Sequence, residues 1–273
     1  MKSINEYVSE KNLLLDKYEK RVRTWLKKDD KHNISEKIPF FRDGVVCPEV
    51  WFAPGNDFRP LFILKEVSLG IDEIKCLDCY LETWGNQKTF EFIENPFDDV
   101  QVGKFTLWRK IVALAKGLCD VHNGLSVPEY DIGSFAYMPG GQKYTGNIKG
   151  YIDYGEVTAN PLYNEFVKKI AVLEIKKIGG GRSVGSELSL ATKYYSEHIN
   201  PFEDLILEEI ELINPTVIIC CCKEFLTGKL LKSIESKTNG IEWIYGCHPT
   251  MNTIENFYFA PVKQYYESIK NNT

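Results

Sequence analysis

Apolar residues recur along this chain at two different spacings, which predict two kinds of element. From 205 to 213 they recur at helical spacing, and Asn214-Pro215 ends that pattern because the residue before a proline is pushed out of the helical region. Residues 216–222 are then a short apolar run, rich in β-branched side chains. Such a run is typical of a strand covered on both faces, as in a parallel sheet with helices on either side.

The same two patterns occur elsewhere in the chain and predict an α/β protein. Helical spacing predicts further helices at 4–28, 106–115, 189–195 and 225–235. Short apolar runs predict buried strands at 59–64, 170–175 and 241–245. Between 40 and 52, apolar runs lie on either side of a turn signal. This pattern is compatible with a β-hairpin or with a loop.

Composition is that of an ordinary globular protein, with 44% hydrophobic and 26% charged residues. No run of apolar residues approaches the length of a membrane span, and residues 1–6 lack the regions of a signal peptide. We therefore expect a cytoplasmic protein, without a membrane partner and monomeric.

The eight cysteines are then expected to be reduced thiols. Cys220, Cys221 and Cys222 lie in an apolar run, where cysteine behaves as a small buried hydrophobe. Cys76 and Cys79 have CxxC spacing, but a zinc site needs a second pair and the sequence shows none. We expect neither a metal nor another cofactor.

The order of elements near the C-terminus resembles a known superfamily. The sequence ILEEIELINPTVIIC at 206–220 is followed about 25 residues later by a strand that ends in His248-Pro249-Thr250. This order resembles the C-terminal half of the uracil-DNA glycosylase superfamily, in which an acidic helix, a proline and an apolar strand precede a loop beginning His-Pro-Ser or similar. The resemblance implies a three-layer α/β/α sandwich around a short central parallel sheet.

The resemblance also suggests how the chain is divided. It covers residues 59–261, interrupted by a divergent insertion at about 71–161. Residues 1–58 are then an accessory helix and loop packed on a main domain at 59–273.

The loop after the first strand matches the superfamily only in part. In that family this loop is rich in glycine, contains a proline, and carries a polar residue that assists attack on the sugar. Here Glu66 stands at the polar position, while Lys65 and Ser68 stand where glycine and proline are usual. The resemblance implies a catalytic role for Glu66, with Lys65 and Ser68 beside the base, and the lost glycine and proline put catalysis in doubt. The alternative is that Glu66 caps the following helix.

Glu174 stands where the superfamily has an asparagine that recognises the flipped base. An amide offers one donor and one acceptor to uracil, whereas an ionised glutamate offers acceptors only. Glu174 therefore favours a base edge that presents an amine, such as cytosine or adenine, over uracil. Alternatively, Glu174 pairs with Lys65 or Lys176 at the strand ends.

His248 completes the candidate site at the end of the last strand. Base excision needs a donor near the leaving base and a carboxylate near the sugar cation. The resemblance assigns the first role to His248 and the second to Glu66, with Pro249 and Thr250 contacting nucleic acid. The alternative for His248 is an ordinary hydrogen bond within its loop.

A net charge of −5 argues against a broad DNA-coating surface but leaves a local basic face open. Lys176, Lys177 and Arg182 flank a glycine-rich run at 179–181 whose backbone N–H groups could approach phosphates. A flexible turn on a solvated face of mixed charge is the alternative.

Two functions from different classes follow from these residues. The first is an N-glycosidic hydrolase that excises a base from DNA, with little preference for uracil. The second is a protein on the same scaffold that binds a nucleotide or nucleic acid without cleaving it. The lost glycine and proline favour the second.

Overall fold

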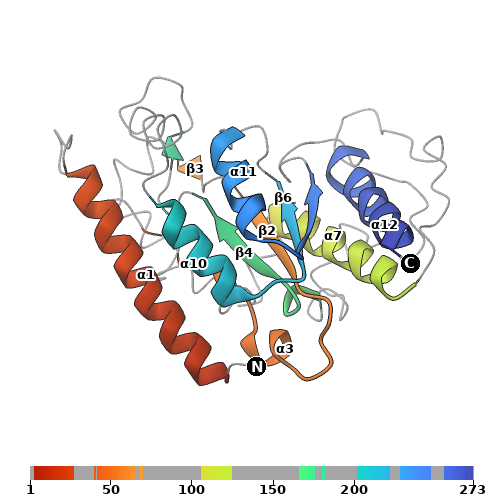
Figure 1. The fold of residues 1–273 in the computed structure, drawn as a ribbon, viewed down its shortest axis with the longest axis horizontal. Helices are drawn as coiled ribbons and strands as arrows, with labels where there is room; N and C mark the ends of the chain where they lie inside the picture. The colour runs from red at the N-terminus through yellow and green to blue at the C-terminus, as the bar shows by residue number, and fades with distance from the viewer. Residues whose placement is uncertain are drawn as a thin grey trace.

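The structure is a computed structural model that describes residues 3–27, 40, 42–64, 68–69, 106–124, 166–175, 177, 180–181, 202–221, 228–246 and 255–272. Within these ranges, helices pack on both faces of a central five-stranded sheet (Figure 1). The chain therefore has an α/β fold, as its hydrophobic pattern predicts. None of the described helices is both long and apolar enough to cross a membrane.

The sheet combines four parallel strands with one antiparallel edge strand. Its members are β1 (Gly44–Val45), β2 (Pro60–Leu64), β4 (Ala171–Glu174), β6 (Val217–Cys220) and β7 (Glu242–Tyr245). Their order in space is β1-β4-β2-β6-β7. β2 and β4 are parallel, with Leu61 opposite Ala171, whereas β1 is antiparallel to β4, with Gly44 opposite Val172. The sheet is therefore mixed, which corrects the expectation of a wholly parallel sheet.

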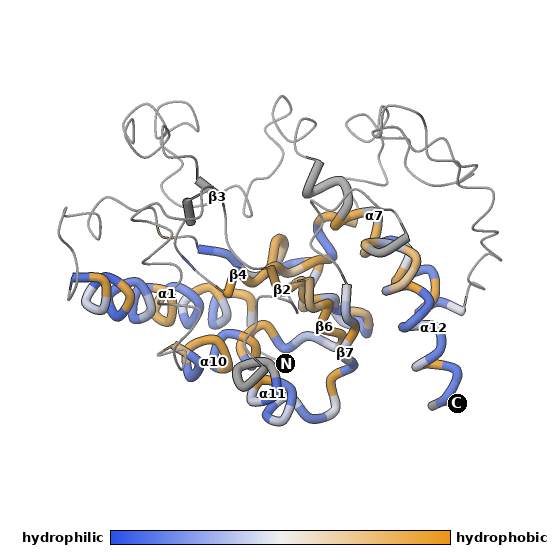
Figure 2. Tube along the Cα trace, turned by 90° about the horizontal axis from the view of Figure 1, so that it is seen from above, coloured by the Kyte–Doolittle hydropathy of each residue, from blue (hydrophilic) through white to orange (hydrophobic). Residues whose placement is uncertain are grey.

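The composition of the strands follows from their positions. Every residue of β2, β4 and β6 is buried, because these central strands are covered on both faces. β7 lies at an edge, and only Ile244 of its four residues is fully covered. Figure 2 shows β2 and β6 mainly in the colour of hydrophobic residues, while hydrophobic and polar colours alternate along the helices.

One face of the sheet is covered by a helix from the middle of the chain and by the C-terminal helices. Its helices are α7 (Thr106–His122), the π-helical turn η3 (Glu255–Phe259) and α12 (Ala260–Asn272). The strands present Phe62 and Ile219 to this core. α7 and η3 approach closely at Gly117, where an added Cβ would come within 2.2 Å of the Tyr258 hydroxyl.

The other face is covered by helices from both ends of the sequence. These are α1 (Ile4–Leu26), α10 (Glu203–Ile213) and α11 (Gly228–Lys237). Leu61, Ile63 and Ile218 point into this second core. Because α1 and α10 lie side by side, residues 4–26 form part of the same layered unit (Figure 1).

The ends of these helices use the signals that the sequence contains. The Ser3 side chain accepts a hydrogen bond from the Glu6 N–H, and the Glu6 carboxylate accepts one from the Ser3 N–H, which is a capping box. α10 ends at Asn214, which adopts a left-handed conformation with φ of 52°, and Pro215 follows.

Several predicted elements differ from those observed. The region at 40–52, for which a hairpin or a loop was expected, contains β1 and the short helix α3 (Pro48–Trp51). The helix expected at 106–115 continues to His122, and the one expected at 225–235 is α11. α12 was not predicted, although Val262, Tyr265 and Ile269 have helical spacing. The helix expected at 189–195 and most of the insertion expected at about 71–161 lie outside the described residues.

Candidate functional site

The order of the parallel strands creates one topological switch point. From β2 the chain crosses to β4 on one side, and from β6 it crosses to β7 on the other. The connections that follow β2 and β6 therefore leave in opposite directions from two adjacent strands. In open α/β sheets, ligands bind in the crevice that this divergence leaves at the carboxyl ends of the strands. The candidate site is consequently the carboxyl edge around Leu64 and Cys220.

A small second sheet lies beyond this edge and brings together two predicted segments. β3 (Ser68–Leu69) and β5 (Gly180–Gly181) are parallel, with Ser68 opposite Gly180. β3 follows β2 in the sequence, and β5 follows β4. The backbone of Ser68, predicted beside the base, is thus next to the glycine-rich run predicted to approach phosphates.

Most of the other predicted site residues lie outside the described residues. They are Lys65, Glu66, Lys176, Arg182, His248, Pro249 and Thr250. Their roles therefore stay predictions. Their neighbours in sequence are described: β2 ends at Leu64 and β7 ends at Tyr245.

Glu174 is the last residue of β4 and lies opposite Leu64 of β2. It is only 7% exposed, and strand alternation places its side chain on the face of Val172, towards the core under α7 and α12. Its N–H donates a hydrogen bond to the Asp43 carboxylate. A buried carboxylate at this edge is shielded from water and can discriminate between hydrogen-bond donors and acceptors.

The position of Lys177 in the structure corrects the prediction made for it. It was expected to contact nucleic acid, but its side chain is completely buried. Its ammonium group contacts the Asp43 carboxylate and lies 3.0 and 2.9 Å from the two carboxylate oxygens of Glu209. A lysine enclosed between two carboxylates cannot bind a phosphate, so Lys177 does not belong to a basic surface.

This buried charge cluster, Asp43, Lys177 and Glu209, has more carboxylates than ammonium groups. All three residues are at most 2% exposed. Burial raises the pKa of Glu209 to about 8; Lys177 opposes that rise, and Asp43 adds to it through its charge and a hydrogen bond. Burial alone would lower the pKa of Lys177, but the two carboxylates outweigh burial and raise it above its ordinary value. The raised pKa of Glu209 favours a proton on that carboxyl group at neutral pH, beside the Lys177 ammonium.

Sequence reasoning missed Asp43 and Glu209. Asp43 precedes Gly44 and was included in a turn signal. The burial of Glu209 could be predicted from the sequence. This residue lies four residues after Leu205 and four before Ile213, on the apolar stripe of α10. A carboxylate on that stripe must be buried with a partner.

A second polar group lies at the opposite edge of the sheet. His122, at the end of α7, lies 3.0 Å from the Tyr265 hydroxyl through Nδ1 and 3.3 Å from Asp57 through Nε2. Asp57 precedes β2, so this group is at the amino edge. A histidine at a helix C-terminus beside a carboxylate stabilises the helix end, and we assign it that structural role.

Among the described cysteines, Cys119, Cys220 and Cys221 are buried and Cys47 is partly buried. Cys220 and Cys221 are buried, as predicted, while Cys76, Cys79 and Cys222 lie outside the described residues. No group of three or more potential metal ligands is found within the described ranges.

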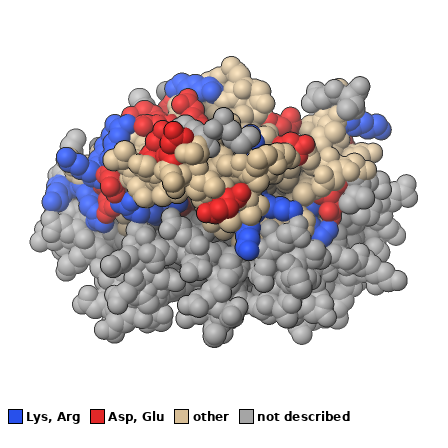
Figure 3. Space-filling model, turned by 90° about the horizontal axis from the view of Figure 1, so that it is seen from below, with Lys and Arg blue, Asp and Glu red and all other residues tan. Residues whose placement is uncertain are grey.

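Charges are mixed on the face that Figure 3 displays, with lysines and arginines interspersed among aspartates and glutamates. No protein-family model, curated protein or solved structure matches this chain.

Proposed function

We propose that this protein binds a nucleic-acid base at the carboxyl edge of its sheet and hydrolyses the N-glycosidic bond of that base. The proposal extends to a sandwich similar to that of the uracil-DNA glycosylases. The observation that carries it is the switch point between β2 and β6. The helix-proline-strand unit at 206–220 and the His-Pro-Thr sequence at 248–250 support the resemblance.

The two catalytic candidates are close to this edge in the sequence. Glu66 is two residues beyond the end of β2, and His248 is three beyond the end of β7. Since each residue of extended chain spans at most about 3.6 Å, their backbones are within roughly 7 and 11 Å of the two strand ends. β6 separates β2 from β7, so both residues can reach one ligand.

The proposed reaction needs one carboxylate and one donor. The bond between C1′ of the sugar and the base nitrogen breaks, and its electron pair stays with the base. Glu66 stabilises the developing oxocarbenium ion and orients the water whose oxygen bonds to C1′. His248 donates a hydrogen bond to the base as it becomes negative, and the proton lost by the water ends on the base.

Glu174 determines the choice of base in this proposal. An ionised glutamate accepts hydrogen bonds and repels a carbonyl edge, so a base with an exocyclic amine is preferred to uracil. The burial of Glu174 supports this role, because an unmatched partner of a buried carboxylate is costly.

Binding without cleavage is the second candidate. The loop after β2 has Lys65 and Ser68 where the glycosylases have glycine and proline. Of the family's loop pattern, this chain keeps the polar residue at Glu66 and lacks the glycine and the proline, which favours binding without catalysis.

A cleavage assay separates the two functions. The full chain is incubated with single- and double-stranded oligonucleotides, each carrying one uracil, modified cytosine or modified adenine, and abasic sites are cut with alkali. Glu66→Gln and His248→Ala are compared with Glu267→Gln, an exposed carboxylate of α12.

We expect cleavage next to an amine-bearing base. Loss of a catalytic group should reduce the rate about 100-fold or more in the two site variants, with Glu267→Gln unchanged. A clear preference for uracil would contradict the role of Glu174. Binding with no cleavage on any substrate would establish the second function.

A further inference from the structure

Five hydrogen bonds hold the chain where it leaves β4. The Glu174 N–H donates to Asp43, and the Ile175 N–H donates to the Leu64 carbonyl at 3.0 Å. The Tyr18 hydroxyl donates to the Ile175 carbonyl at 3.5 Å. Lys177 then donates to Asp43 and to Glu209. Within four residues the chain is attached to α1, to α10 and to the segments around β1 and β2.

This attachment lies directly before the second sheet. β5 begins at Gly180, three residues after Lys177, and pairs with Ser68 and Leu69 beyond β2. The direction in which the chain leaves β4 therefore determines how β3 and β5 meet. Asp43 acts on both sides of the strand end, because one of its oxygens holds the Glu174 N–H and the other holds the Lys177 ammonium.

The charges of the buried charge cluster balance only when one of its two carboxyl groups carries a proton. Three fully charged groups would leave one uncompensated negative charge in the core, which is costly. With a proton on Glu209, the ammonium balances Asp43, and Glu209 can donate a hydrogen bond to Asp43. When that proton is lost, Asp43 and Glu209 repel each other across Lys177.

We propose that Asp43, Lys177 and Glu209 are positioning residues that clamp the end of β4 while Glu209 carries its proton, and release it when that proton is lost. The clamp places Glu174 at the carboxyl edge and directs β5 onto β3. The role of the clamp in positioning a base-reading residue rests on the proposed function. The clamp itself rests on the contacts of the buried charge cluster, supported by the raised pKa of Glu209.

Other titratable groups lie around the buried charge cluster. Tyr18 lies against Lys177, with its ring centroid 6.0 Å from the ammonium nitrogen. Lys11 of α1 packs beside Gly44, the residue after Asp43. Glu174 points to the opposite face of the sheet. On α10 itself, Glu208 and Glu211 are exposed.

Hydrogen exchange tests the clamp without any ligand. The full chain and Glu209→Gln are labelled at about pH 6 and about pH 9, with labelling times scaled for the intrinsic exchange rate, and read by mass spectrometry. Glutamine keeps the shape and a donor of the protonated acid but cannot ionise. Glu208→Gln, an exposed neighbour on the same helix, is the matched control.

We expect the amides of Glu174 and Ile175 in the wild type to exchange about tenfold faster at pH 9 than at pH 6 after scaling, since one pH unit above the titration shifts the equilibrium about tenfold. Glu209→Gln should remain protected at both pH values, and Glu208→Gln should behave as the wild type. Peptides of α7 and α12, on the other face of the sheet, give an internal reference within each sample.

Equal protection of this segment at both pH values in the wild type would overturn the clamp, even if Glu209→Gln failed to fold. A pH-dependent opening that persists in Glu209→Gln would also overturn it.

Binding of a fluorescent single-stranded cytosine-rich oligonucleotide at pH 9 then tests the link to function. Glu209→Gln should bind it about tenfold more tightly than the wild type at that pH. No binding by either protein would reject the proposed function and leave the clamp standing.

Discussion

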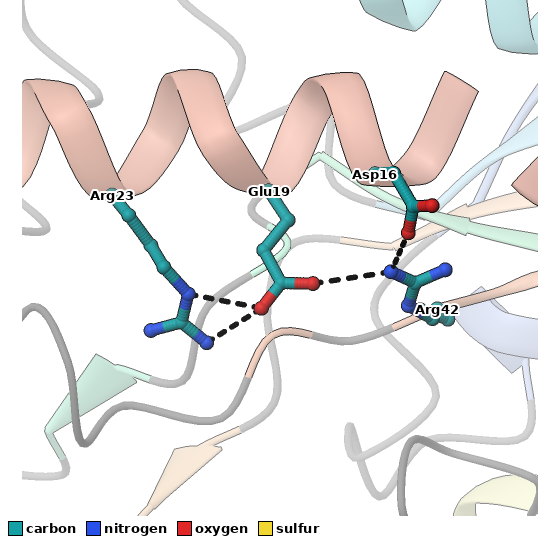
Figure 4. A network of polar contacts seen from close by, with 4 residues as sticks. All are labelled: Asp16, Glu19, Arg23 and Arg42. Atoms are coloured by element: carbon teal, nitrogen blue, oxygen red, sulfur yellow. Dashed lines mark hydrogen bonds and ion pairs between the residues drawn. The ribbon is translucent and has the colours of Figure 1, made fainter. Parts of the chain in front are cut away.

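The chain places two adjacent residues, Arg42 and Asp43, in two very different electrostatic environments. Arg42 joins a surface network on α1, contacting Asp16 and lying 3.2 Å from Glu19, which in turn pairs with Arg23 at 2.7 Å (Figure 4). Asp43 joins the buried charge cluster with Lys177 and Glu209 described above. The two groups hold β1 to neighbouring elements with the same kinds of charge, and they differ in burial.

That difference determines how much each group contributes to stability. The side chains of the surface network are between 21% and 63% exposed, so water and salt screen their attraction. In the buried charge cluster, desolvation and attraction are both large, and they oppose each other. Removing one partner there leaves a charge that neither water nor protein compensates. Loss of the buried ammonium should therefore reduce stability far more than loss of a partner in the surface network.

Removal of the buried ammonium is expected to have the largest effect. Lys177→Met keeps the length of the side chain but leaves the Asp43 carboxylate unpaired in the core, which should reduce the free energy of unfolding by about 3–5 kcal/mol. Urea unfolding followed by circular dichroism measures the loss. Lys168→Met, at an exposed lysine just before β4, should change stability by less than about 0.5 kcal/mol. A loss below about 1 kcal/mol in Lys177→Met would mean that water reaches the cluster.

The second carboxyl group of the buried charge cluster should make the free energy of unfolding depend on pH. The folded state binds the Glu209 proton up to about pH 8, whereas an unfolded glutamate releases it near 4.5. The folded state thus holds more protons across that window, so the free energy of unfolding should fall as the pH rises through it. Lys177, whose pKa is raised, keeps its proton throughout, and its contribution is lost only in more alkaline solution.

Glu209→Gln should flatten this dependence. Relative to the wild type, the variant should be nearly equal in stability at about pH 4 and progressively more stable as the pH rises, by several kcal/mol at about pH 9. Urea titrations at several pH values give both curves. A wild type whose stability is constant between these pH values would show that Glu209 ionises without penalty.

The sequence predicts the layers of this protein better than its charges. Buried β-branched runs identified the parallel strands, and Asn214-Pro215 correctly ended α10, because these signals are local. The antiparallel position of β1 is a two-residue contact with β4, more than a hundred residues away in sequence, and no local pattern encodes it. The same holds for Lys177, whose basic neighbours in sequence suggested a surface, while its partners come from two distant segments.

The candidate site shows the same limit. Residues at the ends of predicted strands are readable from the sequence, since strand ends follow from the apolar runs. The switch point is a property of the strand order β4-β2-β6-β7, which depends on long-range pairing. The burial of Glu174 follows from that pairing too, because β4 lies between β1 and β2.

The smallest effect is expected in the surface network. Arg42→Ala removes the link between α1 and the segment before β1, but water replaces the lost partners of Asp16 and Glu19. The free energy of unfolding should fall by about 0.5–1 kcal/mol in dilute buffer, and by less in about 1 M salt, where the Debye length is short. Lys177→Met should show little salt dependence in the same experiment, since buried pairs are screened much less. Equal salt dependence in the two variants would contradict the distinction between them, because it would mean that both groups interact through solvent.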